Sequence, residues 1–103
     1  TSQCYEGLIN NYSHTDNATL TLLAAATGMN FIVALGTTVA KYFRLYPNAN
    51  DYIILDGTAG ADGKYVGIAS AVAGAMIQFI AIQTGASEWN WCATTISGAW
   101  AAE

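Results

Sequence analysis

Residues 66–87 read VGIASAVAGAMIQFIAIQTGAS, and the interpretation of the whole chain depends on this run. It has no ionisable side chain, and only Gln78, Gln83 and a few Ser and Thr residues interrupt its apolar character. A helix of about 20 mostly apolar residues is long enough to cross a bilayer core. The run therefore predicts a long apolar helix that either fills the core of a domain or enters a membrane.

Small residues recur along this run at four-residue spacing, as in Gly67, Ala71 and Ala75 and again in Ser70 and Gly74. On a helix, this spacing creates a face that another backbone can approach closely. We expect a membrane-active helix whose relevant residues are Val66, Gly67, Ser70, Ala71, Gly74, Ala75, Gln78 and Phe79.

A second uncharged stretch, residues 17–40, leads into another predicted helix. Apolar and aromatic residues recur at three- and four-residue steps across residues 31–45, which is the helical period. Tyr46 would end this helix, because a residue that precedes proline disfavours the helical backbone. The sequence thus predicts two long apolar helices, one on each side of a more polar middle segment.

Shorter segments favour β-structure. Residues 52–55 are rich in β-forming side chains, and residues 87–100 alternate with a period of two. Residues 1–10 are a further candidate strand. Residues 18–27 are ambiguous, because alternating Thr and Leu suggest a strand whereas LLAAA favours a helix.

This order of elements predicts an α+β fold. A two-layer α/β sandwich, with a small antiparallel sheet packed on the two apolar helices, would bury the apolar surface of both. The alternative is an all-α fold in which residues 18–45 form a helical hairpin. The length of 103 residues suits a single domain, residues 1–103.

The composition limits the classes of partner. Hydrophobic residues make up 53% of the chain and charged residues only 10%, and the net charge is −4. Lys41, Arg44 and Lys64 are its only cations. Nucleic acids are bound through clustered Lys and Arg, so no nucleic-acid partner is expected. Any activity on a membrane would depend on the burial of apolar side chains.

The two cysteines, Cys4 and Cys92, lie near opposite ends of the sequence. This spacing fits neither a zinc site nor a redox motif and favours a disulfide that joins the two ends. Two buried free thiols are the alternative. A start at Thr1 suggests a processed, secreted product. Asn11 and Asn17 begin glycosylation sequons, which occur by chance at about this frequency.

Residues for catalysis are scarce. The single histidine, His14, follows Ser13, but no third residue completes a catalytic triad. Asp56 and Asp62 are too sparse for a calcium loop, so neither a metal nor a cofactor is expected. The three tryptophans are possible surface-recognition residues or membrane-interface anchors, with core packing as the alternative: Trp89, Trp91 and Trp100.

A small acidic chain with Cys4, Cys92 and the apolar run 66–87 resembles the secreted killer toxins of yeasts and other fungi. The resemblance covers the outline of the whole chain and implies killing of fungal cells by cell-wall binding followed by membrane permeabilisation. It carries over no functional residue. The expected partners are a target-cell membrane and a cell-wall polysaccharide receptor, with oligomers forming on insertion.

The alternative is a secreted, non-enzymatic recognition module, either an effector or a domain that binds carbohydrate or protein. Neither reading makes the chain an enzyme.

Overall fold

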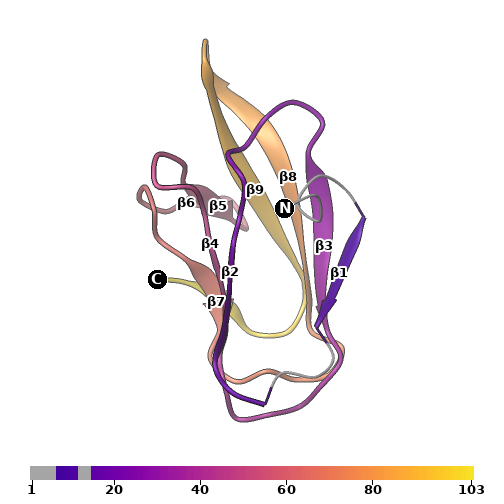
Figure 1. The fold of residues 1–103 in the computed structure, drawn as a ribbon. Helices are drawn as coiled ribbons and strands as arrows, with labels where there is room; N and C mark the ends of the chain where they lie inside the picture. The colour runs from indigo at the N-terminus through magenta and orange to yellow at the C-terminus, as the bar shows by residue number, and fades with distance from the viewer. Residues whose placement is uncertain (1–6, 12–14) are drawn as a thin grey trace.

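The fold is built from β-strands in the part of the chain that is described. The computed structural model describes residues 7–11 and 15–103, and these residues form ten strands and no α-helix. The strands make two sheets that face each other as the layers of a sandwich (Figure 1). None of the described residues belongs to a helix long and apolar enough to cross a membrane.

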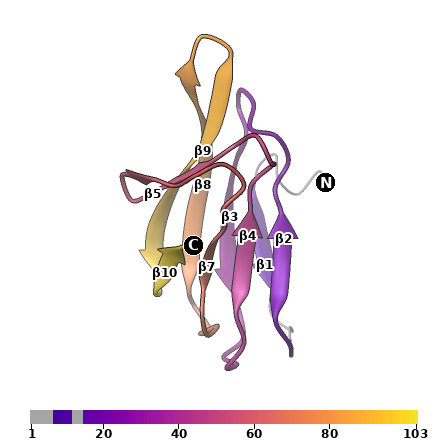
Figure 2. The ribbon, with the colours of Figure 1, turned by 90° about the vertical axis from the view of Figure 1, so that its left-hand side faces the viewer.

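The two sheets differ in size. Sheet A has six strands in the order β1 (Leu8–Asn11), β3 (Asn30–Leu35), β8 (Met76–Gly85), β9 (Glu88–Ser97), β5 (Ile53–Leu55) and β6 (Thr58–Ala59). Sheet B has four strands in the order β10 (Trp100–Ala102), β7 (Val66–Ile68), β4 (Phe43–Tyr46) and β2 (Ala18–Thr21). Figure 2 views the molecule from the side of sheet B, with β4 and β2 next to each other.

The first four strands alternate between the two sheets. β1 pairs in parallel with β3 in sheet A, and β2 pairs in parallel with β4 in sheet B. A parallel pair requires a long crossover connection, and here a strand of the opposite sheet lies within each crossover. Later in the chain, β8 and β9 form a long antiparallel hairpin, and β9 pairs in parallel with β5.

The prediction of an apolar helix over residues 66–87 is wrong. The run contributes β7 to sheet B and β8 to sheet A, and residues 69–75 connect them. Within this connection, Gly74 has a positive φ of 93°, and a Cβ atom added there would meet nothing within 4 Å. Gly74 therefore makes a turn and is not part of a tightly packed small-residue face.

The sequence of β8 explains why its periodicity was misleading. Ile77, Phe79 and Ala81 are buried, and they alternate with more exposed residues. Because the more exposed set includes Met76 and Ile80, both faces of the strand are apolar. Apolar residues on both faces produce a continuous apolar run, which periodicity alone cannot distinguish from a buried helix.

The predicted helix over residues 31–45 is wrong for a related reason. It divides into β3 and β4, which belong to different sheets. In β4, Phe43 and Leu45 are buried while Arg44 and Tyr46 are half-buried, which is the period of a strand. The α+β sandwich and its all-α alternative are therefore both replaced by an all-β fold, in which a second sheet occupies the place assigned to helices.

The strand predictions fared better. The segments 52–55 and 87–100 contain β5 and β9, and the ambiguous segment 18–27 begins with β2. Of the candidate strand over residues 1–10, the described part contains most of β1, whereas residues 1–6 lie outside the described residues.

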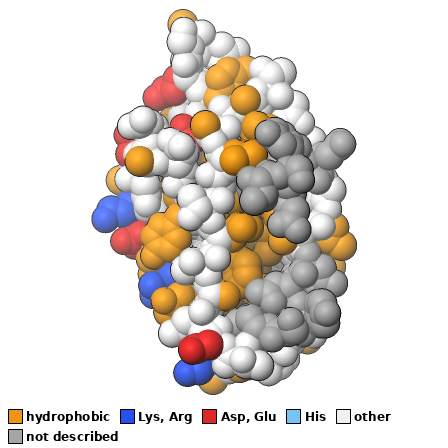
Figure 3. All heavy atoms as spheres, in the orientation of Figure 1, with side chains coloured by type: hydrophobic (Ala, Val, Ile, Leu, Met, Phe, Trp, Pro, Cys, Tyr) orange, Lys and Arg blue, Asp and Glu red, His pale blue; other side chains and the backbone are white. Residues whose placement is uncertain are grey.

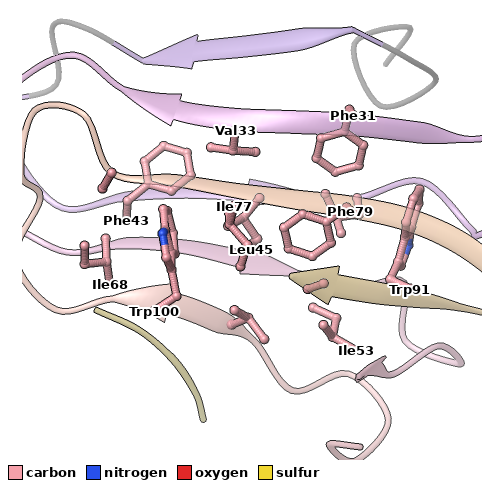
Figure 4. Packing of buried hydrophobic residues seen from close by; sticks show 14 of the residues in the cluster. Phe31, Val33, Phe43, Leu45, Ile53, Ile68, Ile77, Phe79, Trp91 and Trp100 are labelled. Atoms are coloured by element: carbon pink, nitrogen blue, oxygen red, sulfur yellow. The ribbon is translucent and has the colours of Figure 1, made fainter. Parts of the chain in front are cut away.

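An aromatic cluster lies toward one end of the core (Figure 4). The rings of Phe31 and Phe79 stack with their centroids 5.1 Å apart, and Trp91 meets both edge-on at 5.4 and 6.3 Å. Such offset and edge-on pairs add to the gain from apolar burial. The indole Nε1 of Trp91 donates a hydrogen bond to the carbonyl oxygen of Leu23 at 3.3 Å, so its one polar group is satisfied.

Candidate functional site

The outer face of sheet B carries a cluster of one arginine and three tyrosines, which we call the arginine–tyrosine platform: Tyr42, Arg44, Tyr46 and Tyr65. Arg44 and Tyr46 point outward, because they alternate along β4 with the buried residues Phe43 and Leu45. Tyr65 lies directly before β7, which pairs with β4. Strand pairing therefore brings together side chains that are distant in the sequence.

The guanidinium of Arg44 lies between two tyrosine rings. Its Cζ atom is 3.8 Å from the centroid of the Tyr42 ring and 4.3 Å from that of Tyr65. A cation within about 6 Å of a ring face is attracted by the ring quadrupole. The Tyr65 ring also contacts that of Tyr46, with centroids 5.4 Å apart. These ring contacts restrain the side chain of Arg44.

Gly67 provides the surface on which Arg44 lies. The two residues are partners in the β4–β7 register, and Gly67 is buried although it lies on the outer side of the sheet. A Cβ atom at this position would stand 2.9 Å from Cγ of Arg44 and 2.7 Å from the carbonyl oxygen of Phe43. The lack of a side chain at Gly67 therefore allows Arg44 to cross the strand between the rings.

Three hydrogen bonds hold the backbone of Tyr42 and Tyr65, on either side of Arg44. The N–H of Tyr65 donates to Oε1 of Glu103 at 3.0 Å, and the N–H of Glu103 donates to the carbonyl oxygen of Tyr65 at 2.9 Å. The N–H of Tyr42 donates to Oδ1 of Asn17 at 3.1 Å. The backbone that carries the rings is thus held by both neighbouring segments of the chain.

A hollow of about 110 Å³ opens beside the platform. Arg44 and Tyr65 form its walls, and the other lining residues are small or apolar: Gly67, Ile68, Ala69, Ala101 and Ala102. A second hollow lies at the β7–β8 connection, but its lining of Val72, Ala73, Gly74, Ala75, Ser97 and Gly98 has neither an aromatic nor an ionisable side chain. The first hollow therefore has both a cationic and an aromatic side chain in its lining, and the second has neither.

The charges around the platform are unevenly paired. Lys41 lies 4.0 Å from Asp16, and Lys64 lies 3.5 Å from Glu103. Within residues 7–11 and 15–103, Arg44 has neither an ion pair nor a side-chain hydrogen bond. Figure 3 shows that the charged side chains visible from this direction gather along the left and lower rim of the molecule.

The residues predicted to form a membrane-active helix are not brought to one face. Val66 and Gly67 lie in β7, while Gln78 and Phe79 lie in β8 of the other sheet. The remaining four, Ser70, Ala71, Gly74 and Ala75, lie in the connection between these strands. The structure therefore separates a set of residues that a helix would have aligned.

The tryptophans do not form a surface cluster. Trp91 is fully buried and Trp100 is 7% exposed, while Trp89 is partly buried against the core. Core packing, the alternative considered for these residues, describes Trp91 and Trp100. Trp89 is half-buried, as are the four described tyrosines.

The predicted disulfide can be followed at one end only. Cys92 lies in β9, is half-buried and carries a free thiol. Cys4 lies outside the described residues, so its pairing with Cys92 stays a prediction. Of the two sequon asparagines, Asn17 is exposed and its side chain accepts the hydrogen bond from Tyr42.

Of the two loop aspartates, Asp56 is hydrogen-bonded to a residue of β9. Asp56 accepts hydrogen bonds from the backbone N–H of Thr95 at 2.8 Å and from its hydroxyl at 2.7 Å. These bonds, the backbone one first, lower the pKa of the Asp56 carboxyl below its usual value. Among the described residues, no three His, Cys, Asp or Glu side chains gather closely enough to hold a metal ion. Asp56 acts as a structural tie between β5 and β9.

Sequence reasoning missed the platform, although the signal was present. Residues 42–46 read YFRLY, in which Tyr42, Arg44 and Tyr46 alternate with the buried Phe43 and Leu45. Read as a strand, this pattern places the three polar residues on one face. The predicted helix over residues 31–45 instead places these residues in its last turns, where positions two apart do not share a face.

Comparison of the chain with protein-family models, with curated proteins and with solved structures finds no match. The resemblance to fungal killer toxins therefore stays a prediction, and any function must be argued from the geometry of the chain itself.

Proposed function

We propose that this chain is a secreted, non-enzymatic recognition module that binds its ligand through the arginine–tyrosine platform. One observation carries the proposal: Arg44 is held between the rings of Tyr42 and Tyr65, beside a hollow, with no protein acceptor among the described residues. Tyr and Arg are enriched at the energetic centres of binding interfaces. Restraining them in advance reduces the entropy lost on binding.

The position of the platform also supports binding over catalysis. It lies on the outer face of a sheet and combines aromatic rings with a cation, but no nucleophile and general base meet there among the described residues. The membrane-permeabilising toxin, which was the leading expectation, relied on a single uncharged helix. In the described structure these residues lie in β7, in β8 and in the connection between them rather than in one helix.

A binding screen with matched variants tests the proposal. The folded chain is applied to an array of cell-surface saccharides, and every binder is measured again with Tyr65→Ala and with Tyr52→Ala, a half-buried tyrosine outside the platform. We expect Tyr65→Ala to lose binding and Tyr52→Ala to keep it. Equal binding by both variants, or the absence of any binder, would contradict the proposal. Release of dye from liposomes by the wild-type chain would favour the toxin instead.

A further inference from the structure

We infer that the ligand of the platform is a saccharide that carries a carboxylate, such as a uronic or sialic-type acid. This inference rests on the proposed function and names the class of ligand. The geometry points to a carboxylate received by Arg44 and to a sugar ring that lies over the adjoining hollow.

The donors of Arg44 identify the charged group. A guanidinium has five N–H donors in a planar fork, and it cannot lose its charge in a protein. The flanking ring faces of Tyr42 and Tyr65 attract the charge without accepting conventional hydrogen bonds, and no other described group accepts one from this side chain. A carboxylate matches this fork with two parallel hydrogen bonds, which is the geometry that favours Arg over Lys.

The surrounding charges indicate a ligand with isolated carboxylates. Lys41 and Lys64 are already paired with Asp16 and Glu103, which leaves Arg44 as the cation that lacks a carboxylate partner among the described residues. A nucleic acid or a polyphosphate requires several clustered cations. The chain as a whole has a net charge of −4 and would repel such a polyanion.

The location of the platform in the sheet favours a saccharide over an acidic peptide. β4 and β7 are the two inner strands of sheet B, so their backbone groups are used in the ladders with their neighbours. An extended peptide gains much of its affinity from backbone hydrogen bonds at an open sheet edge, which this position does not offer. A sugar needs only ring faces, hydroxyl partners and a smooth apolar contact surface.

The platform supplies those features. Gly67, Ala69 and Ala101 are among the residues that line the hollow, and their small side chains leave apolar space for the C–H face of a pyranose ring. The half-buried ring of Tyr65 lines it and contacts the ring of Tyr46, and Thr19, the partner of Arg44 in the β2–β4 register, is exposed on the other side. The exposed Thr19 therefore offers a hydroxyl group on the side of Arg44 away from the hollow.

Titration calorimetry with pairs of acidic and neutral saccharides tests the inference. The first pair of probes is a galacturonic acid trisaccharide and its methyl ester, which keeps the sugar rings and removes the charge. The second pair is sialyllactose and lactose, which distinguishes a terminal acid from one within a polymer. We expect the wild-type chain to bind at least one acid about tenfold or more tightly than its neutral counterpart, because hydrogen bonds to charged groups have this magnitude.

Three variants identify the residues involved. Arg44→Gln should weaken binding of the acid by about tenfold or more and leave any residual binding of the neutral probe unchanged. Arg44→Lys keeps the charge and the aliphatic stem over Gly67, so its loss of affinity would show that the planar fork is required. Lys41→Gln removes the same charge from an exposed residue three positions before Arg44 and should bind as the wild type does. Native circular dichroism spectra confirm that each variant is folded.

The outcomes separate this inference from the proposed function. If neutral and acidic saccharides bind equally and Arg44→Gln has no effect while Tyr65→Ala abolishes binding, the carboxylate is refuted and the recognition function stands. If Lys41→Gln weakens binding as much as Arg44→Gln, the contact is only long-range attraction and the inference is overturned. If neither probe pair binds and the array also gives no binder, both proposals fail.

Discussion

Gly67 shows how the absence of one side chain shapes the surface of the molecule. Most glycines here serve turns, but Gly67 lies inside a strand, where glycine is normally a cost. Its role is to leave room for Arg44, whose stem covers it and whose head group then lies between two rings. The platform therefore depends on a residue that contributes no chemistry of its own.

We predict that Gly67→Ala destabilises the fold by about 1–3 kcal/mol, the usual cost of overpacking. The new Cβ atom would stand 2.7 Å from a backbone oxygen of Phe43, so backbone would have to move. Gly85→Ala is the control, because its Cβ atom would meet only the side chain of Glu88 at 3.3 Å. Urea denaturation of both variants measures the difference, and equal stability of Gly67→Ala and the wild type would show that the close approach is absent.

The lowered pKa of the Asp56 carboxyl predicts that the stability of the fold depends on pH. Its carboxyl pKa is lowered by the bonds from Thr95, so the charged form stabilises the folded chain. This contribution is complete above the unfolded carboxyl pKa of about 3.9 and is lost as the pH falls through the lowered folded value. Asp56→Asn keeps a residue that tolerates the positive φ of 49° but removes the charge.

Melting temperatures of the wild type and Asp56→Asn between pH 2.5 and pH 7 check this. We expect the wild type to be the more stable protein at neutral pH and the two curves to converge in acid. A difference that is independent of pH would mean that the charge of Asp56 does not contribute.

At the scale of the secondary-structure elements, β8 has two apolar faces. Its inward residues complete the aromatic core, whereas its outward residues lie on the outer face of sheet A. Neighbouring positions in the sequence therefore have very different environments. Gln78 is half-buried on the outer face and Phe79 is fully buried between the sheets.

We predict that Phe79→Ala costs about 3–5 kcal/mol of stability, as other large core truncations do. The adjacent change Gln78→Glu should stay within about 0.5 kcal/mol of the wild type, because it changes a half-exposed side chain that has no hydrogen bond to another described residue. Chemical denaturation of both variants tests the alternation. Equal destabilisation at both positions would point to an element buried on all sides, as in the rejected helix.

The sequence predicted β5 and β9 but failed at β8, whose two faces are both apolar, and at β4, although the residues of β4 alternate. β9 and β5 were recognised from alternating or β-branched residues. β8 was missed because Met76, Ile80 and Ile82 make its outer face apolar too. For the candidate site, sequence alone could have grouped the three residues of YFRLY, but it could not have added Tyr65. That contact exists only because β7 pairs with β4, a long-range choice that no local pattern records.

At the scale of the whole molecule, the two sheets share one core. Phe31, Phe79 and Trp91 from sheet A belong to the same buried cluster as Leu45 and Val66 from sheet B (Figure 4). Because each sheet buries one face only against the other, neither has a core of its own. The described part of the chain therefore forms a single cooperative unit.

We predict that thermal unfolding followed by far-ultraviolet circular dichroism and by tryptophan fluorescence gives coincident transitions. The first signal reports the strands of both sheets, and the second reports mainly the buried indoles of Trp91 and Trp100. Two separate midpoints would show that one sheet survives without the other, which would contradict a shared core.

The alternation of the first four strands between the sheets also governs how fast the chain can fold. β1 pairs only with β3, and β2 pairs only with β4. The chain between the two strands of each pair includes a strand of the opposite sheet. No hairpin can begin this half of the structure, so the entropy of closing long loops is lost before any pairing compensates for it. Folds dominated by such distant pairings take milliseconds to seconds to form. Nucleation is therefore expected at the β8–β9 hairpin, with the N-terminal strands joining last.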